Sequence, residues 1–192
     1  MAAAECGALT GGAPDTEGVA DVATVAHVPR AAYVRLGVRV LASGASLEEL
    51  VDAVATRGGW PDGFSIAFTS LREDSELRQR ESIIAVADAM GSARPDLRNP
   101  TTRLLLAEQT GHVWLGEIVT EPDKSYDLHD TKPHRTSASL PSRMARALVN
   151  LAGPEAASIV DPCCGTGSIL LEACRLGLAA VLERVVGPVR QP

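Results

Sequence analysis

One short segment of the sequence combines residue types that could hold a charged ligand. Asp161 ends a short apolar run and is followed by the turn Pro162–Gly167, in which Gly165 and Gly167 lie close together before the helix-like run ILLEA. Glycines let the backbone turn tightly and approach a ligand, and a helix N-terminus offers free N–H groups at a positive dipole end. Neither the spacing GxGxxG nor a GK[ST] ending is present, so neither a dinucleotide fingerprint nor a P-loop fits.

This turn suits a cofactor whose amino-acid end is a zwitterion. The carboxylate of such a cofactor would meet backbone N–H groups, and Asp161 would take its ammonium group. In open α/β sheets, ligands bind at the carboxyl ends of the strands, where this turn would lie. An ordinary strand-to-helix connection is the alternative, because glycines are common in turns.

The segment DPCCGTGSILLEA resembles motif I of the THUMP-associated RNA methyltransferases, usually D-P-F-C-G-[ST]-G-T-I-L-I-E-A. Two further segments agree with this family. Lys132–Arg135 followed by Ser139–Ala152 is similar to its K-P-H-R…L-x-P-x-L-A-R-A-M-V-N-L segment, and Asp96–Pro100 is similar to the D-L-x-N-P end of a THUMP domain. The three matches occur in the family's order over about residues 95–177.

The resemblance implies a THUMP region that binds structured RNA, with tRNA foremost, and a Rossmann-like domain that methylates a base from S-adenosyl-L-methionine (SAM). The exocyclic amine of guanine is the leading candidate for the acceptor. By the motif, the methionine end of SAM would be lined by Asp161, Pro162, Cys164, Gly165, Thr166 and Gly167, with Ser139 and Leu140 against them from the upstream side. His134 and Arg135 could contact RNA phosphate, although solvated linker residues are as common.

The end of the sequence departs from the family's pattern. Family members continue with a strand ending in an acid that holds the ribose hydroxyls, and later with a [DN]-P-P-Y motif that holds the target amine. Glu183 is the only acidic residue near the first of these places, its context does not match, and the second motif does not occur before Pro192. We therefore expect a C-terminally truncated chain, or one that a partner protein completes. No catalytic residue is assigned, and SAM binding by the chain alone is expected to be weak.

Hydrophobic periodicity predicts an α/β protein that begins with a small α+β region in the order β-α-β-α-β-β. A capping box of Ser46 and Glu49 marks the start of its first helix, and a tight turn at Gln109–Gly111 joins its last two strands. The second helix is predicted over Ser75–Met90, with Ile83, Ile84, Val86 and Ala87 as its apolar stripe. The predicted organisation is a mobile tail over 1–25, a THUMP-like region over 30–120, a linker over 121–137, and the start of an incomplete methyltransferase domain over 138–192 with a helix over 141–152.

Composition restricts the function only weakly. The formal net charge of −6 argues mildly against a dedicated nucleic-acid binder, although a local basic patch can occur on an acidic protein. The four cysteines form no CxxC pairs, and His27, His112 and His129 show no ligand spacing, so we expect no metal site and a reducing, cytoplasmic compartment. No apolar run is long enough for a membrane span.

For some side chains, the sequence alone allows more than one interpretation. Cys163 and Cys164 are expected to be small buried packing residues. Arg143 and Arg146 could form a small basic face, but a solvated helix face is more common. Two other functions remain open for the chain: a DNA amino-methyltransferase that shares motif I, and a non-catalytic remnant that binds RNA or a partner.

Overall fold

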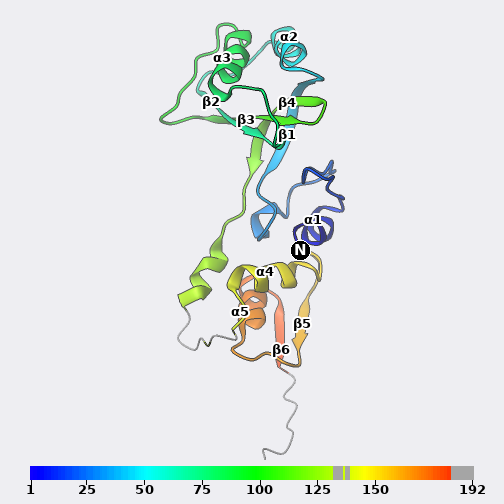
Figure 1. The fold of residues 1–192 in the computed structure, drawn as a ribbon. Helices are drawn as coiled ribbons and strands as arrows, with labels where there is room; N and C mark the ends of the chain where they lie inside the picture. Colours follow the sequence, from blue (N-terminus) through cyan, green and yellow to red (C-terminus); the bar gives the residue numbers. More distant parts are fainter. Residues whose placement is uncertain (132–135, 137–138, 183–192) are drawn as a thin grey trace, which may run out of the picture. The chain divides into compact units, whose positions relative to one another are not determined.

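The computed structural model describes residues 1–131, 136 and 139–182. The chain divides into two compact units: unit 1 comprises residues 1–35 and 121–192, and unit 2 comprises residues 36–120 (Figure 1). Across the residues described, no helix is long and apolar enough to cross a membrane.

Unit 2 is a four-stranded mixed sheet with two helices on one face, as Figure 1 shows. The strand order is β1-β4-β3-β2, and β2 and β3 run parallel while the other neighbours are antiparallel. The elements are β1 (Gly37–Gly44), α2 (Leu47–Arg57), β2 (Phe64–Ser70), α3 (Gln79–Ala89), β3 (Thr102–Gln109) and β4 (His112–Thr120). The predicted order β-α-β-α-β-β is therefore confirmed, while the assignment of this unit as a THUMP domain stays a prediction.

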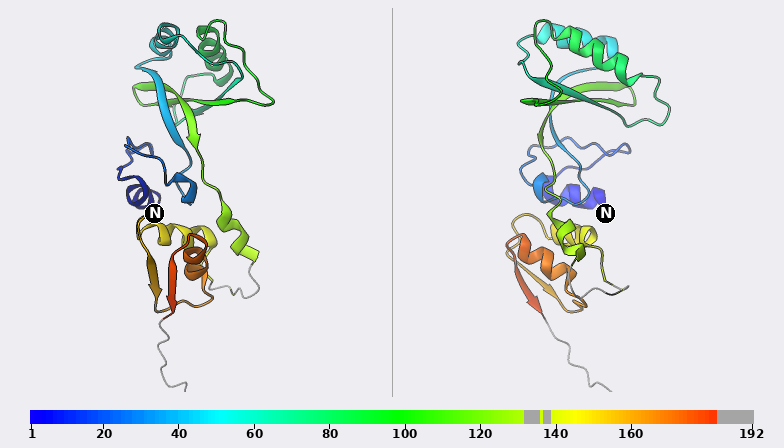
Figure 2. Two further views of the ribbon diagram at one scale, coloured as in Figure 1. Left: turned by 180° about the vertical axis from the view of Figure 1, so that it is seen from behind. Right: turned by 90° about the vertical axis from the view of Figure 1, so that its left-hand side faces the viewer.

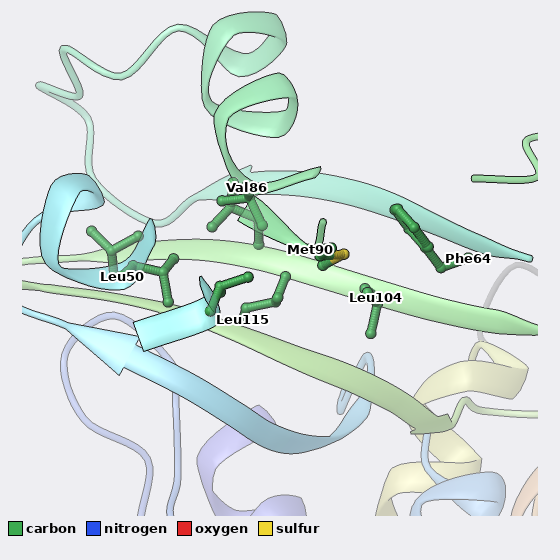
Figure 3. Close-up of a cluster of buried hydrophobic side chains, with 9 residues drawn as sticks. Leu50, Phe64, Val86, Met90, Leu104 and Leu115 are labelled. Carbon is green, nitrogen blue, oxygen red and sulfur yellow. The ribbon is translucent and has the colours of Figure 1, made fainter. Parts of the chain in front are cut away.

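The core of unit 2 lies between the two helices and the sheet (Figure 3). Leu50 of α2 and Val86 of α3 are fully buried against Leu104 and Leu115 of the two central strands. Because successive side chains of a strand point to opposite faces, Leu105 belongs to a second apolar cluster on the other side of the sheet.

Local sequence explains where the two helices begin. The Ser46 side chain accepts a hydrogen bond from the N–H of Glu49 at 3.2 Å, and the Glu49 carboxylate accepts one from Ala45 N–H at 2.8 Å, which confirms the capping box. The predicted start of the second helix at Ser75 is wrong, because the Ser75 hydroxyl bonds the carboxylate of Glu108 on β3 and α3 begins four residues later.

The described part of unit 1 contains a βαβ unit preceded by helices. Strands β5 and β6 pair in parallel, with α5 as the crossover between them, and α5 and α4 enclose a small core around Val149, Ala173 and Leu178 (Figure 2). The elements are α1 (Ala2–Thr10), η1 (Val28–Arg30), η2 (Ser125–Thr131), α4 (Ser142–Asn150), β5 (Ser158–Asp161), α5 (Ser168–Arg175) and β6 (Ala179–Leu182).

The first 25 residues differ from the expected mobile tail, because they begin with a helix that is anchored by a buried charge. Glu5 of α1 is fully buried. Its carboxylate accepts hydrogen bonds from the backbone N–H groups of Ala32–Val34 at 2.7–3.3 Å and from the side-chain amide of Asn150 at 2.7 Å. The run of Ala, Gly and Thr around Glu5 has no period, and the partners lie far away in the sequence, so the pattern gave no sign of this anchor.

The expected linker also carries structure of its own. Residues 125–131 form the 3-10 helix η2, and the ring of Tyr126 is buried against Ala32 and Ala147 of unit 1. A polar, Pro-containing composition led to the linker prediction. The buried Tyr126 ring and polar contacts of Ser125 and His129 hold this segment against α4 and α5.

Candidate functional site

The loop between β5 and α5 is bent at two glycines. Gly165 and Gly167 adopt φ values of 51° and 76°, in the left-handed region that favours glycine, and Gly167 is the N-cap residue of α5. A Cβ placed on Gly167 would meet no atom within 4 Å, so the space over this part of the loop is clear. A ligand can therefore approach the main chain closely here.

The N-terminus of α5 offers hydrogen-bond donors to that space. No side chain among residues 1–131, 136 and 139–182 caps this helix end. The first N–H groups of a helix have no partner inside the helix, and with the helix dipole they favour an anionic group. The loop can therefore receive a carboxylate or a phosphate.

Asp161 is held at the rim of the loop by the backbone that follows it. Its Oδ1 accepts a hydrogen bond from the N–H of Cys163 at 3.0 Å, and the residue is half-buried at the end of β5. Pro162 is exposed and Cys164 is half-buried. Asp161 thus places a carboxylate, which favours cations, at the end of β5. The N-terminus of α5, which favours anions, follows a few residues later. Together they suit a ligand that carries both a positive and a negative charge.

The segment before α4 closes one side of the loop. The Thr166 hydroxyl donates to Oγ of Ser139 at 2.9 Å, and the Ser168 hydroxyl donates to the carbonyl oxygen of Leu140 at 3.0 Å. The structure therefore brings the predicted residues Ser139 and Leu140 to the predicted loop from the upstream side. The other two upstream candidates, His134 and Arg135, lie outside the described residues.

A buried ionic cluster lies behind the loop, and sequence reasoning missed it. Glu172 of α5 and Arg146 of α4 are both fully buried and are joined by a hydrogen bond of 2.5 Å from Arg146 Nε. Nδ1 of His129 in η2 lies within hydrogen-bond distance of the other Glu172 oxygen. Arg146 also donates to the hydroxyl of Ser125 at 2.9 Å and to the carbonyl oxygen of Arg30 at 3.3 Å.

This cluster corrects one expectation from the sequence. Arg146 is not on a solvated or basic face, because its charge is neutralised inside unit 1 by Glu172. Arg143 is exposed and lies over the ring of Tyr33 at 4.4 Å. One sequence pattern could have predicted buried polar contacts on α4. Polar residues recur there every four positions, at Ser142, Arg146 and Asn150, and so lie on one face of the helix, which is buried.

The cluster alters the acidity of the groups around it. Burial and the nearby Arg146 cation both lower the pKa of Arg30. Burial raises the pKa of Tyr126. For Asp123, burial raises the pKa, but hydrogen bonds from Ser125 and the charge of Arg146 outweigh it, so the pKa lies below its usual value. Asp123 thus stays ionised near the buried cation.

The cysteines of the loop are more accessible than expected. Cys163 is exposed and Cys164 is half-buried, so the expectation that both are buried packing residues is wrong for Cys163. In the part of the chain that the structure describes, no group of three or more His, Cys, Asp or Glu side chains could hold a metal ion.

The chain is similar to known proteins over the region that contains this loop. Residues 130–187 match the family model described as RMKL-like, methyltransferase domain (UPF0020). The chain is 31% identical over 149 residues to the tRNA (guanine(10)-N2)-dimethyltransferase of Pyrococcus abyssi, covering 72% of this chain and 44% of that protein. It is 29% identical over 126 residues to the protein of the same name from Methanothermobacter thermautotrophicus, covering 62% and 37%. The chain thus spans less than half the length of these relatives.

A solved structure supports the fold. The crystal structure of TrmN from Thermus thermophilus matches with a TM-score of 0.51 and 23% identity, covering 78% of this chain and 48% of that one. The predicted α/β architecture with a Rossmann-like part is confirmed by this likeness. The loop, its helix and the upstream segment all lie inside residues 130–187, the region of this chain that matches the RMKL-like methyltransferase-domain model.

Proposed function

We propose that this chain is part of a SAM-dependent methyltransferase that acts on a guanine amine of tRNA, and that residues 161–168 hold the methionine end of the cofactor. The observation that carries the proposal is the glycine-bent loop at the N-terminus of α5, with Asp161 at its rim. SAM would supply an electrophilic methyl group at this site.

The residues present fit the two charges of that methionine end. The α-carboxylate would accept hydrogen bonds from the first N–H groups of α5, beside Gly165 and Gly167, where no Cβ blocks the approach. The N–H of Gly167 itself donates to the carbonyl oxygen of Cys164 at 2.7 Å and so fixes the turn. The α-ammonium would donate to the Asp161 carboxylate, whose Oδ1 is already oriented by the N–H of Cys163. Ser139 and Leu140 would close the upstream wall, since Thr166 and Ser168 already bond to them.

The nature of the acceptor is supported by the relatives and by one surface of unit 2. The two curated relatives are both tRNA guanine dimethyltransferases by name. In unit 2, Arg57 and Trp60 line a hollow of about 500 Å³, and the Arg57 guanidinium lies 5.0 Å from the centre of the Trp60 ring. Arg39 also lines this hollow, where it is paired with Glu117, so Arg57 is the cation that we assign to phosphate. Guanidinium groups bind phosphate and an indole face can receive a base, so this hollow suits RNA in an otherwise acidic chain.

A methyl-transfer assay tests the proposal. The protein is incubated with SAM labelled in its methyl group and, in parallel, with total tRNA, double-stranded DNA and no nucleic acid, and the recovered nucleosides are separated by chromatography. We expect whatever label is transferred to be found in methylated guanosine from tRNA, and none with Asp161→Ala. Label in DNA alone would favour a DNA amino-methyltransferase. No label in any sample, together with tRNA binding in a separate binding measurement, would favour the non-catalytic remnant.

A further inference from the structure

One face of α5 carries polar groups that lead from the loop into the buried cluster. Ser168 and Glu172 lie one turn apart on α5 and therefore face the same way. Together with Thr166, just before the helix, they make up what we call the polar face of α5. Ser168 bonds the carbonyl oxygen of Leu140, and Glu172 bonds Arg146 and approaches His129.

Among the described residues, the hydrogen-bond partners named for this face come from one stretch of the chain. Ser139 and Leu140 precede α4, Arg146 lies within α4, and His129 belongs to η2, so the segment 129–146 meets α5 through polar contacts at both ends. Any shift of α5 along this segment would break several hydrogen bonds at once. The position of the loop relative to its upstream wall is therefore tied to the Glu172 contacts.

An ionic pair is a costly way to pack two helices. Both Arg146 and Glu172 are fully buried, and replacing such a pair by apolar side chains of similar volume is often neutral or stabilising. Apolar contacts, however, tolerate small sliding movements, whereas a carboxylate bonded on both oxygens fixes one arrangement. A buried pair directly behind a binding loop is thus better explained by geometry than by stability.

We propose that Glu172 is a positioning residue for the cofactor site, which holds α5 through Arg146 and His129 so that the loop 161–167 meets its upstream wall at Ser139 and Leu140. The inference rests on the proposed function, because it concerns the same site. It assigns Glu172 no contact with the cofactor: its effect reaches the ligand only through the placement of the loop.

The decisive variant removes the charges and keeps the packing. In the double variant Arg146→Met with Glu172→Leu, apolar side chains replace the pair. The Ser125 hydroxyl and the Arg30 carbonyl oxygen each lose one donor, so the variant should keep a cooperative thermal transition at a moderately lower temperature. The dissociation constant for SAM is measured by NMR titration of the backbone amides of Gly165 and Gly167. We expect it to rise about tenfold, which corresponds to about 1.4 kcal/mol, the usual contribution of roughly one hydrogen bond to the ligand.

A matched control separates positioning from general damage to unit 1. Glu5 is also a fully buried carboxylate of unit 1, but its partners are Ala32–Val34 and Asn150 and not the polar face of α5. Glu5→Gln should lower the melting temperature and leave SAM affinity unchanged. If the double variant melts cooperatively and binds SAM as tightly as the unsubstituted protein, the positioning role is overturned.

A milder substitution covers the case in which the double variant does not fold. His129→Ala removes one Glu172 contact and keeps the buried pair, and it should weaken SAM binding several-fold. His129→Asn, whose amide can take the place of Nδ1, should restore it. If both His129→Ala and His129→Asn bind SAM as tightly as the unsubstituted protein, the proposal is contradicted. Absence of SAM binding by the unsubstituted protein would overturn the proposed function itself, and this inference with it.

Discussion

Gly167 carries the strongest constraint of any single residue in the loop. Its φ of 76° is disfavoured for residues with a Cβ, although the space around a Cβ would be empty. The need for glycine here is therefore conformational and not a matter of local crowding. A side chain at this place would also stand in the space that we assign to the cofactor.

Gly167→Ala should lower the free energy of unfolding by about 1–2 kcal/mol, the usual cost of the left-handed conformation for a residue with a Cβ. It should also weaken SAM binding. Gly111 provides the control, because it has a φ of 67° in the turn between β3 and β4 and equally open surroundings. Gly111→Ala should show the same loss in urea unfolding and no change in SAM affinity. Equal effects of both substitutions on affinity would remove Gly167 from the site.

For single residues, the sequence allowed prediction of the loop 161–167 and not of the buried pair of Arg146 and Glu172. Asp161, Gly165 and Gly167 are recognisable because a strand, a glycine turn and a helix follow one another without a gap. Arg146 and Glu172 are 26 residues apart and on different helices. Their pairing depends on how α4 packs on α5, which local periodicity does not encode.

Among the elements, α1 shows how a short helix without an apolar stripe is kept in place. Its buried residues are Glu5 and Leu9, and the Glu5 carboxylate takes hydrogen bonds from an extended backbone segment and from α4. This helix is therefore held by a specific polar contact more than by hydrophobic area.

Glu5→Ala should destabilise unit 1 by about 3 kcal/mol or more, because each buried donor left without an acceptor costs about 1–3 kcal/mol. Urea unfolding followed by circular dichroism measures the loss. Leu9→Ala, which shortens the other buried side chain of α1, serves for comparison. A loss from Glu5→Ala no larger than that of a surface substitution would mean that α1 is not anchored as described.

The remaining elements show which sequence patterns are reliable. The capping box at Ser46 and the turn before β4 were predictable because their residues lie next to each other in the chain. The buried face of α3 was predicted only in part: Val86 is fully buried, whereas Ile84, two residues earlier, is 46% exposed. Apolar character alone did not reveal which side of the helix faces the sheet.

For the whole molecule, each of the two units has a hydrophobic core of its own. The core of unit 2 includes Leu50, which is fully buried, and that of unit 1 includes Leu178, which is 6% exposed. Compact units with separate cores can unfold separately.

Calorimetry should therefore resolve two unfolding transitions. Leu50→Ala and Leu178→Ala each remove a buried leucine side chain, which costs about 2–5 kcal/mol, and each should lower one transition and leave the other in place. A single transition that both substitutions shift equally would show that the chain unfolds as one cooperative unit.

The claim on which the account depends most is that the loop 161–167 binds the amino-acid end of SAM, and the most direct test is an NMR titration with SAM that follows the backbone amides of Gly165 and Gly167. The account predicts saturable shifts of these amides in the unsubstituted protein. It also predicts a dissociation constant about ten- to a hundredfold higher in Asp161→Ala, since a hydrogen bond to a charged group contributes about 1.5–3 kcal/mol. Shifts confined to other residues, or an unchanged affinity after loss of the Asp161 carboxylate, would contradict it.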